Sequence, residues 1–532
     1  MKKSRKPIKS ETFVIDNEYK EHVCSQSYLG KKGYTITKSV LSKPDYEFLK
    51  KDLFMKPQVF GANYGGETMN EFPVYRENEK KMYLPRFYGI QRYGLPPKSE
   101  IQYGDDIDVT FAKPLRDYQN HIIDIYRNYV SKPICYGSLH NGSGGILEVP
   151  CGRGKTVMAL KIIADLKKKT LIIVHKEFLM NQWIERIEEF LPGAKVGKIQ
   201  AQVCEVDGCD IVIGMVQTLY DKEFPAGTFD GFGLTIIDEV HRIGSEQFSK
   251  TLFKTITPYM LGISATVDRK DQLTRVLYMF IGEKIYEERR KQEDAVCVRA
   301  IEYQSSDAVF NEPEVDFRGN TKYSSMIVKL CEFGPRSDFI VRVIKDLICE
   351  DADSQIMVLA HNRSLLTYLY SAIQHHKIAT VGFYVGGMKQ AALQDTESKN
   401  IVLATYAMAA EALDIKTLST LVMVTPKTDI TQSVGRILRV KHENPIIVDI
   451  VDKHEVFQNQ WVQRRRFYKK ANYRIRYIDS SRYSGMSINW TTDTTWKRVF
   501  EPKDAAICDA VEPEETVLPF GGNCLIDVNF DE

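Results

Sequence analysis

Short apolar runs alternate with longer amphipathic segments over most of the chain. In the first region with this rhythm, residues 112–290, the apolar runs fall at 145–149, 171–174, 211–213, 234–237 and 260–263. The amphipathic segments between them include 157–166 and 178–190. β-Branched runs of this length are typical of buried strands, and strands that alternate with helices form βαβ units. We therefore predict a parallel sheet covered by helices in this region.

The same rhythm returns over residues 291–480. Its apolar runs fall at 356–359, 380–384, 401–404, 421–424 and 445–451. The chain is therefore expected to be of the α/β class, with two parallel-sheet domains in tandem. A stretch rich in Ser, Asn, Gly and Pro at 305–322 predicts a loop or an insertion in the second domain.

The two flanking regions have different patterns. Residues 1–111 contain frequent Tyr, Phe, Gly and Pro without long helical periodicity, which predicts a small accessory domain that is α/β or mostly β. Residues 481–532 are polar and then acidic, which predicts a tail that is partly disordered.

Composition narrows the class of protein without identifying a ligand. The 532 residues carry a formal net charge of only +2, so charge gives no sign of nucleic-acid binding, for which a local basic stripe is enough. No apolar run reaches the roughly 18 residues of a membrane span, and the basic stretch at 1–10 lacks the apolar segment of a secretory signal. The 10 cysteines are scattered without a CxxC pair, which indicates reduced thiols in an intracellular protein.

A strand, a glycine-rich turn and a helix follow one another at 145–160. Gly152 and Gly154 let the backbone curl so that several N–H groups point at phosphate oxygens. The helix that begins near Lys155 adds the positive end of its dipole. In such a loop the lysine reaches the β and γ phosphates, and the hydroxyl of Thr156 binds magnesium. The segment therefore predicts a site for ATP and magnesium.

Charged residues follow at two further places. The apolar run at 234–237 ends in Asp238 and Glu239, which would lie beside the magnesium and the attacking water if the strand ends at the ligand edge of the sheet. Farther on, Arg436 and Arg439 are three positions apart on a predicted helix and so share one face. Arginines supplied in this way neutralise charge on a transferring phosphoryl group.

In their order along the chain, these segments resemble the motifs of the superfamily 2 helicases. The matching segments are Arg116 and Gln119 (Q motif), 149–156 (motif I), 175–183 (Ia), Gln217 and Thr218 (Ib), 238–241 in a DEVH form (II), 264–266 (III), 360–363 (IV), 405–414 (V) and 432–439 (VI). Val149 and Ala412 stand where glycine is usual. Within the superfamily the chain looks most like the xeroderma pigmentosum group B type and the transcription helicases of large DNA viruses. The carriers of that closer resemblance are 174–179, the DEVH box, 268–271 and 437–439.

The resemblance implies two RecA-like domains, at 112–290 and 291–480, with ATP held between them. It assigns catalysis to Lys155, Asp238, Glu239, Arg436 and Arg439. It assigns the binding of ATP and magnesium to Arg116, Gln119, Gly152, Arg153, Gly154, Lys155, Thr156, Asp238, Asp414 and Gln432. It assigns coupling to His241, Ser264 and Thr266, and nucleic-acid binding to His175, Gln217, Thr218, Arg363 and Thr405.

The function that this resemblance implies is an ATP-dependent DNA helicase or translocase that moves 3′ to 5′. Its contacts with the DNA backbone would be independent of sequence and sensitive to salt. The resemblance places the protein in viral transcription, with RNA polymerase or other transcription proteins as partners, or in repair. A viral protein of this kind would act in a cytoplasmic factory or the virion, and a cellular one in the nucleus or cytoplasm. An ATP-gated clamp that recruits partners and an RNA helicase are the alternatives.

Three secondary features have two interpretations each. Residues 461–477 interleave cations with aromatic residues, which fits nucleic-acid binding or packing on the second domain. His375 and His376 fit a solvated helix end better than a metal site. The accessory domain at 1–111 could grip DNA or dock a polymerase.

Overall fold

The computed structural model describes residues 14–56, 71–132, 135–139, 142–150, 153–240, 245–265, 267, 273–288, 296–411, 415, 417–437, 445–490 and 492–502. The chain forms two compact units. The first comprises residues 1–59 and 66–289, and the second comprises 60–65 and 290–532. Among the described residues, no helix is long and apolar enough to cross a membrane.

The N-terminal part of the first unit is α/β, the first of the two predicted alternatives. Its helices are α1 (Asn17–Ser25), α2 (Lys43–Asp52) and α3 (Arg86–Tyr93). Its five-stranded sheet has the order β5 (Arg76–Glu77), β6 (Lys81–Leu84), β2 (Gly33–Thr37), β1 (Tyr28–Gly30) and β7 (Lys98–Ser99), and β3 (Phe54–Met55) pairs with β4 (Phe72–Pro73). The buried guanidinium of Arg86 donates to the carbonyls of Thr257 (2.8 Å) and Pro258 (3.1 Å). The accessory part is therefore joined to the larger sheet of its own unit.

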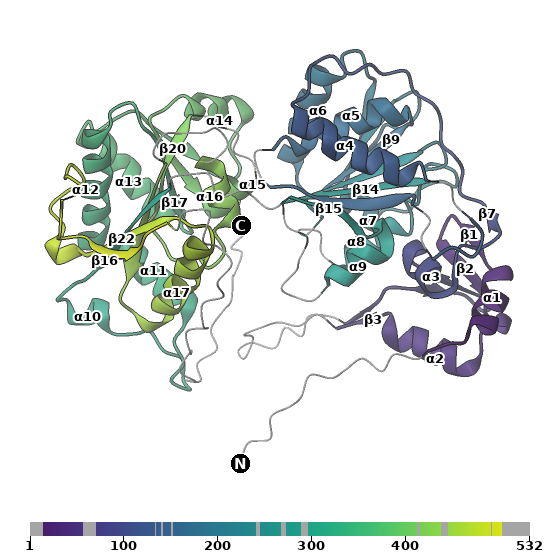
Figure 1. Cartoon of the computed structure of the whole chain (residues 1–532). Coiled ribbons are helices and arrows are strands. Elements are labelled where there is room, and N and C mark those ends of the chain that lie inside the picture. Colours follow the sequence, from purple (N-terminus) through teal and green to yellow (C-terminus); the bar gives the residue numbers. More distant parts are fainter. Residues whose placement is uncertain are drawn as a thin grey trace. The chain divides into compact units, whose positions relative to one another are not determined.

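The larger sheet of the first unit is parallel except at one edge. Its order is β11 (Val203–Cys204), β10 (Val196–Gln200), β12 (Ile211–Met215), β9 (Thr170–Val174), β13 (Leu234–Asp238), β14 (Tyr259–Ser264), β8 (Gly144–Glu148) and β15 (Lys284–Glu287). Helices α4 (Asp117–Val130), α5 (Lys155–Leu166) and α6 (Glu177–Phe190) lie on one side, and α7 (Val216–Asp221), α8 (Ser245–Leu252) and α9 (Thr274–Ile281) on the other (Figure 1). Only β11 is antiparallel to its neighbour. The five predicted strands are the five central ones of this sheet.

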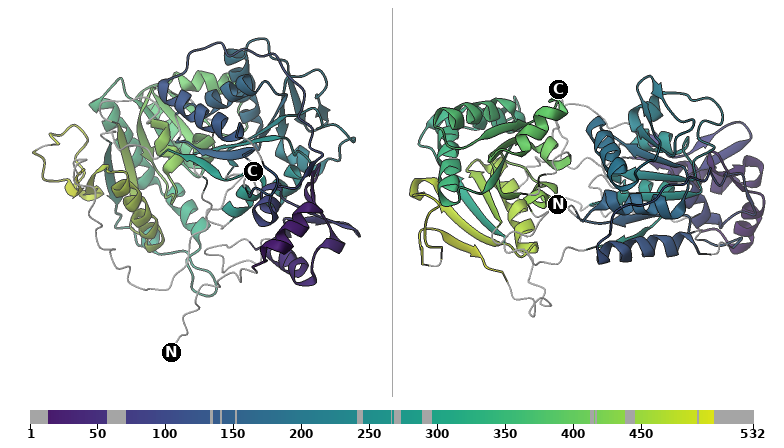
Figure 2. Two further views of the ribbon diagram at one scale, coloured as in Figure 1. Left: turned by 45° about the vertical axis from the view of Figure 1, so that its right-hand side comes forward. Right: turned by 90° about the horizontal axis from the view of Figure 1, so that it is seen from above.

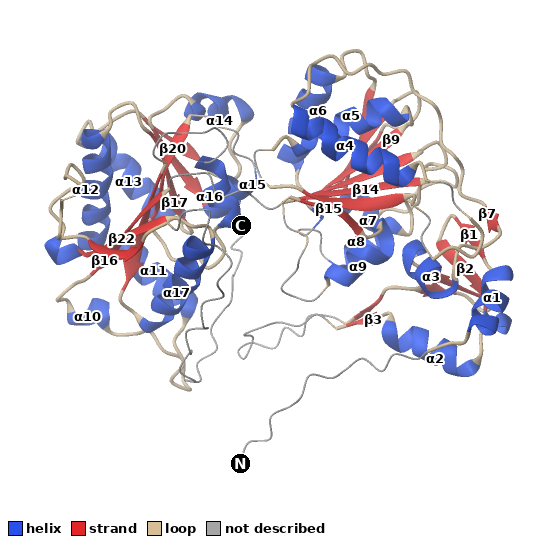
Figure 3. Ribbon diagram, in the orientation of Figure 1, coloured by secondary structure: helices blue, strands red, loops and turns tan. Residues whose placement is uncertain are grey.

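The second unit repeats this architecture. Its sheet has the order β18 (Val381–Tyr384), β19 (Ile401–Thr405), β17 (Gln355–Ala360), β20 (Leu418–Met423), β21 (Ile446–Asp452), β16 (Cys297–Tyr303), β22 (Arg474–Asp479) and β23 (Lys497–Phe500). Its helices are α10 (Ala308–Asn311), α11 (Tyr323–Glu332), α12 (Gly334–Glu350), α13 (Arg363–His375), α14 (Gln390–Glu397), α15 (Tyr406–Glu411), α16 (Thr431–Ile437) and α17 (Glu455–Lys470). Helices α12 and α13 lie on one side of the sheet and α15 and α16 on the other (Figure 3), and the further views show the same layering (Figure 2). The predicted fold class, with two tandem RecA-like sheets and a small accessory part, is confirmed.

Two segments of the second unit differ from their predicted form. The stretch at 305–322 is not only a loop, because it contains the short helix α10. The packed part of the unit also continues past residue 481, since β23 pairs with β22 and Trp496 is buried. The acidic residues from 503 onward lie outside the described residues.

Parallel strands bring their carboxyl ends to one edge of each sheet, where ligands of open α/β sheets bind. In the first unit Ser264 pairs with Glu148 and Asp238 with Ile263, so the ends of β8, β13 and β14 are neighbours. Of the predicted ATP-binding residues, Arg153, Gly154, Lys155 and Thr156 follow β8, and Asp238 ends β13. The fold therefore gathers them at one edge.

Candidate active site

The loop between β8 and α5 has the backbone geometry of an anion-binding turn. Gly154 caps α5 with φ of 76°, in the left-handed region that favours glycine. A Cβ at this position would lie 2.4 Å from the side-chain nitrogen of Gln119, so a side chain here would displace that amide. The first N–H groups of α5 have no partner within the helix and suit phosphate oxygens. Gly152 lies outside the described residues.

Side chains from α4 hold this loop. The amide of Gln119 accepts from the backbone N–H of Arg116 (3.0 Å) and donates to the carbonyl of Arg153 (3.1 Å). Tyr118 donates to the same carbonyl at 3.2 Å, and its ring lies 3.6 Å from the guanidinium of Arg153. That guanidinium also pairs with Glu288, which follows β15. The Q-motif glutamine thus supports the loop, and its predicted contact with adenine stays a prediction.

Lys155 and Glu239 meet across the ends of β8 and β13. The ammonium nitrogen lies 2.9 Å from the carboxylate oxygen, and the side chains are 13% and 20% exposed. Glu239 has φ of 49°, which is uncommon for a residue with a side chain. Its N–H donates to the carbonyl of Ile263 (3.0 Å), so the bond to β14 holds this conformation. Strained backbone of this kind gathers at functional sites.

Asp238 is the buried member of the acidic pair. It is 8% exposed, and its carboxylate accepts a hydrogen bond of 2.9 Å from the indole N–H of Trp183 on α6. Burial and the neighbouring Glu239 raise the pKa of Asp238 to about 6, against the opposing effects of Lys155 and Trp183. Sequence reasoning placed Trp183 in motif Ia without this role, because no local signal links it to Asp238, which lies 55 residues farther along the chain.

The donor set at this edge fits magnesium. Thr156 offers a hydroxyl at the start of α5, and Asp238 offers a carboxylate at the end of β13. Mg²⁺ prefers such oxygen ligands and usually shares them with phosphates. The raised pKa of Asp238 indicates a buried carboxylate that would gain from added positive charge. These residues could therefore hold a magnesium ion together with a nucleotide.

The candidate nucleic-acid contacts of the first unit lie near the ends of β9 and β12. His175 follows β9, and its carbonyl accepts a hydrogen bond of 2.9 Å from the side chain of Gln217 on α7. Thr218 is next on the same helix, and its hydroxyl accepts from the N–H of Ala201 (3.0 Å). The structure thus brings His175 and Gln217 together, and their contact with nucleic acid stays a prediction.

The coupling candidates are described only in part. Ser264 ends β14 and is fully buried, and its carbonyl accepts from the N–H of Val149 (2.9 Å) in the phosphate-binding loop. His241 and Thr266 lie outside the described residues. Ser264 therefore has a direct backbone link to the loop, as a coupling residue would need.

In the second unit, Arg363 and Thr405 lie at the carboxyl edge of the sheet. Arg363 is the first residue of α13, and its guanidinium donates to the carbonyl of Gly386. Thr405 ends β19 and pairs with Ala360 at the end of β17. Both residues are thus on one sheet edge, as their proposed role in nucleic-acid binding requires.

The second unit's predicted ATP contacts are only partly described. Gln432 and Arg436 lie on α16, whose backbone is described without these side chains. Arg439 and Asp414 lie outside the described residues. Their roles stay predictions.

The basic and aromatic stretch at 461–477 packs on the second unit. Arg464 is 1% exposed and forms an ion pair with Asp449 of β21, with nitrogen–oxygen distances of 2.8 and 2.9 Å. The buried hydroxyl of Tyr468 donates to the same carboxylate at 3.0 Å, and Trp461 is 5% exposed. These three side chains belong to the core, so the packing interpretation holds for them.

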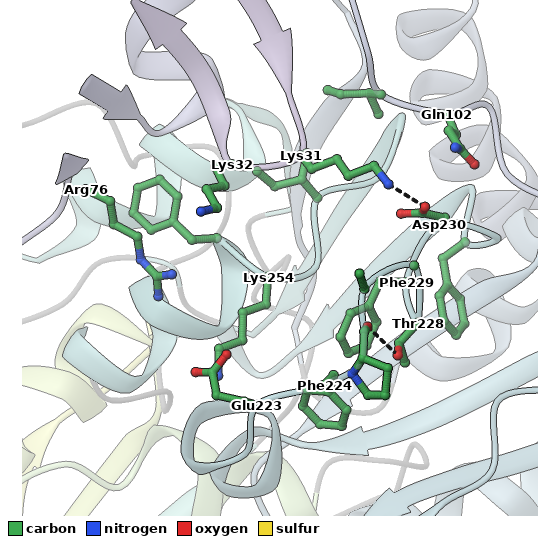
Figure 4. A pocket seen from close by; sticks show the side chains of 17 residues that line it. Lys31, Lys32, Arg76, Gln102, Glu223, Phe224, Thr228, Phe229, Asp230 and Lys254 are labelled. Atoms are coloured by element: carbon green, nitrogen blue, oxygen red, sulfur yellow. Dashed lines mark hydrogen bonds and ion pairs between the residues drawn. The ribbon is translucent and has the colours of Figure 1, made fainter. Parts of the chain in front are cut away.

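A separate cavity of about 300 Å³ lies in the first unit (Figure 4). Lys31, at the turn between β1 and β2, pairs with Asp230 on one side of it. Lys254 lies 3.3 Å from the carboxylate of Glu223 on the other side. The walls include the segments that precede β13 and β14, at the sheet edge opposite to the predicted ATP-binding residues. This cavity is therefore distinct from the candidate active site.

Comparisons with known proteins extend over most of the chain. Residues 112–269 match the family described as "Type III restriction enzyme, res subunit". A protein of Acanthamoeba polyphaga mimivirus, described as a "Putative ATP-dependent RNA helicase", is 34% identical over 466 residues, 84% of this chain and 86% of the relative. A protein of African swine fever virus with the same description is 28% identical over 390 residues, 68% of this chain and 73% of its own. Among solved structures, S. cerevisiae Dbp5 bound to RNA and ADP BeF3 covers 69% of this chain and 94% of its own, at 12% identity and a TM-score of 0.46.

Proposed function

Because the chain belongs to the superfamily 2 helicases, in the group that large DNA viruses carry, we propose that it is a DNA motor. The motor is driven by a nucleotide site at the ends of β8 and β13. Members of this group are ATP-dependent helicases and hence ATP hydrolases. The observation that supports the proposed site is the meeting of Lys155 with Glu239 beside the buried Asp238. We assign the motor to the regions 112–290 and 291–480, and an accessory role to 1–111.

Each residue at this edge has a separate task. Lys155 and the first N–H groups of α5 bind the β and γ phosphates, and Thr156 and Asp238 would hold a magnesium ion. Such an ion would supply positive charge at the phosphates. Glu239 orients the attacking water and accepts its proton. Because the ammonium of Lys155 lies 2.9 Å from Glu239, a phosphate that draws Lys155 away releases this carboxylate for its work as a base.

DNA is the proposed track because the sequence lacks the features of RNA-unwinding DEAD-box proteins. Motif II reads Asp-Glu-Val-His at 238–241, and the segment at 175–183 also differs from theirs. His175, Gln217, Thr218, Arg363 and Thr405 are the proposed backbone contacts. Movement 3′ to 5′, a role in viral transcription and an RNA polymerase partner follow from the sequence resemblance and are part of the proposal.

RNA unwinding is the second candidate. The viral relatives are described as RNA helicases, which favours RNA as the track. A nucleotide-gated clamp without net movement uses the same residues and is the third.

Steady-state ATP hydrolysis by the full chain tests the proposal. The rate is measured alone and with single-stranded DNA, duplex DNA and single-stranded RNA at matched nucleotide concentrations. Stimulation by DNA and little by RNA is the expected result, and the reverse order would replace the DNA track with RNA. Displacement of the third strand of a triplex in the presence of ATP then separates a motor from a clamp, since a clamp leaves the triplex intact.

A further inference from the structure

The connection between β20 and α16, residues 424–430, is held by side chains through its backbone. Four successive carbonyls each accept a hydrogen bond from a different helix. The donors are Arg336 of α12 to Val424 (2.8 Å), Tyr406 of α15 to Thr425 (2.6 Å), Tyr323 of α11 to Pro426 (3.4 Å) and Arg464 of α17 to Lys427 (2.9 Å). A connection between two elements usually runs over the surface and is more mobile than the elements that it joins. This one is fixed by the surrounding helices.

The two arginine donors are themselves locked in place. Arg336 forms two hydrogen bonds of 2.6 and 2.7 Å with Asp452, and both side chains are completely buried. Arg464 is paired in the same way with Asp449. Planar pairs of this type fix direction as well as distance. The carbonyls of Val424 and Lys427 are therefore held by well-ordered donors, and the connection between them has a defined conformation.

Thr425, between these two fixed points, is bound by the residues that directly follow β17 and β19. Its hydroxyl accepts from the N–H of His361 (3.0 Å) and lies 2.9 Å from the imidazole Nδ1 of the same residue. Its carbonyl accepts from Tyr406, whose ring centroid lies 4.8 Å from that of His361. Burial, together with nearby Lys427, lowers the pKa of His361 to about 3, so the imidazole is neutral near pH 7.

His361, Tyr406 and Thr425 each lie close in the sequence to a residue with a proposed functional role. His361 is two residues before Arg363, and Tyr406 directly follows Thr405. Arg363 and Thr405 are the nucleic-acid contacts proposed for this unit. Thr425 stands six residues before the start of α16, which carries Gln432 and Arg436.

We propose that Thr425 is a positioning residue that transmits the engagement of nucleic acid at Arg363 and Thr405 to helix α16. The inference rests on the proposed function, because it concerns how nucleic acid stimulates ATP hydrolysis. A displacement of the ends of β17 and β19 reaches Thr425 through its hydroxyl and its carbonyl, since hydrogen bonds in a buried site do not stretch freely. The displacement then reaches α16 through the short segment that follows. Coupling of this kind requires a physical link between both sites.

The test compares two substitutions at one position. Thr425→Val keeps the shape of the side chain and removes the hydroxyl, and Thr425→Ser keeps the hydroxyl. The full chain with each substitution is assayed for ATP hydrolysis without nucleic acid, for hydrolysis with saturating single-stranded oligo(dT), and for the Kd of a fluorescent oligo(dT). Tyr406→Phe is the second probe, since it removes only the donor to the Thr425 carbonyl.

We expect Thr425→Val to lose roughly tenfold of the stimulation by oligo(dT), within the usual range of coupling between sites, with an unchanged basal rate and a Kd within about twofold. Thr425→Ser retains the stimulation, and Tyr406→Phe loses it as Thr425→Val does. Full stimulation in both Thr425→Val and Tyr406→Phe would overturn the inference. A basal rate that falls in parallel with the stimulated rate would also overturn it, because the role would then be structural only. A wild-type chain that neither oligo(dT) nor oligo(rU) stimulates would reject the proposed function instead.

Discussion

Buried charged groups are unfavourably placed in the candidate active site of the first unit and well paired around the β20–α16 connection of the second unit. At the active site Asp238 is a buried carboxylate with a pKa raised to about 6, and Glu239 has a backbone conformation that costs free energy. In the second unit Arg336 and Arg464 have matched carboxylates with good geometry. The active site therefore contains unfavourable interactions that a bound ligand can relieve. The β20–α16 connection has a defined conformation, through which a displacement can be transmitted.

The largest effect on the rate of ATP hydrolysis is expected from substitutions that remove the charges of the active site. Lys155→Ala and Glu239→Gln should each lower the rate of ATP hydrolysis by at least about a hundredfold, because one removes a phosphate ligand and the other the base. Steady-state hydrolysis at saturating ATP measures both. Lys161→Ala is the control, since Lys161 lies on the same helix and pairs with Asp165 away from the site. Rates near that of wild type in both site variants would reject the assigned site.

The second effect breaks a matched pair. Arg336→Met leaves Asp452 buried without its partner and should destabilise the second unit by about 3–5 kcal/mol. Lys399→Met removes a partly exposed pair with Asp395 in the same unit and should cost less than about 1 kcal/mol. Unfolding in urea, followed by tryptophan fluorescence, measures the difference between the two variants. Equal losses would show that the buried pair is no more important than a surface pair.

The third prediction concerns a substitution that removes the buried charge of Asp238. It should raise the free energy of unfolding and abolish ATP hydrolysis. The folded-state pKa of Asp238 is about 6, above its ordinary value of 3.8, so the folded chain loses stability as pH rises from about 4 to about 6. Asp238→Asn carries no such charge and can still accept the hydrogen bond of Trp183. Without nucleotide or magnesium, it should melt a few degrees higher than wild type at pH 8 and lose this advantage near pH 4. A lower melting temperature of Asp238→Asn at pH 8 would contradict the view that the buried charge of Asp238 destabilises the folded chain.

The smallest effect adjusts the same carboxylate. Trp183→Phe removes a hydrogen bond that lowers the pKa of Asp238 and keeps the aromatic packing. The acidic limb of the ATP hydrolysis profile at limiting magnesium should move upward by less than about one pH unit. Rates measured from pH 5.5 to 8 would detect this shift. An unchanged profile with normal folding would mean that Trp183 contributes packing alone.

The sequence predicted the fold well where strands are buried on both faces. The central strands β9, β13 and β14 are continuous apolar runs, which a parallel sheet requires. The outer strands β10, which lies next to the edge strand β11, and β15, which forms the other edge, escaped prediction. Alternation with polar residues at Val196–Gln200 and Lys284–Glu287 gives no continuous apolar run. Edge position follows from the assembled sheet, which local pattern does not encode.

The same limit applies to the site. Lys155, Asp238 and Glu239 could be proposed because each follows a strand within a short local motif. The supports of those residues could not be proposed, since Trp183 is 55 residues from Asp238 in the sequence. Arg336 is likewise 88 residues from the carbonyl of Val424. Chain folding creates such pairs, and neither partner carries a local signal.

The bond between Arg86 and the start of β14 has a consequence for modularity. The guanidinium is buried and donates to two carbonyls of the larger sheet, and Arg275 of α9 pairs with Asp52 of the accessory helix α2. A graft that exchanges the first 111 residues for those of another helicase would leave the two carbonyls in an apolar interface without donors. A stable chimera therefore has to take α3 and the larger sheet of the first unit from the same protein. The natural boundary for such an exchange is the one along the chain between the two units.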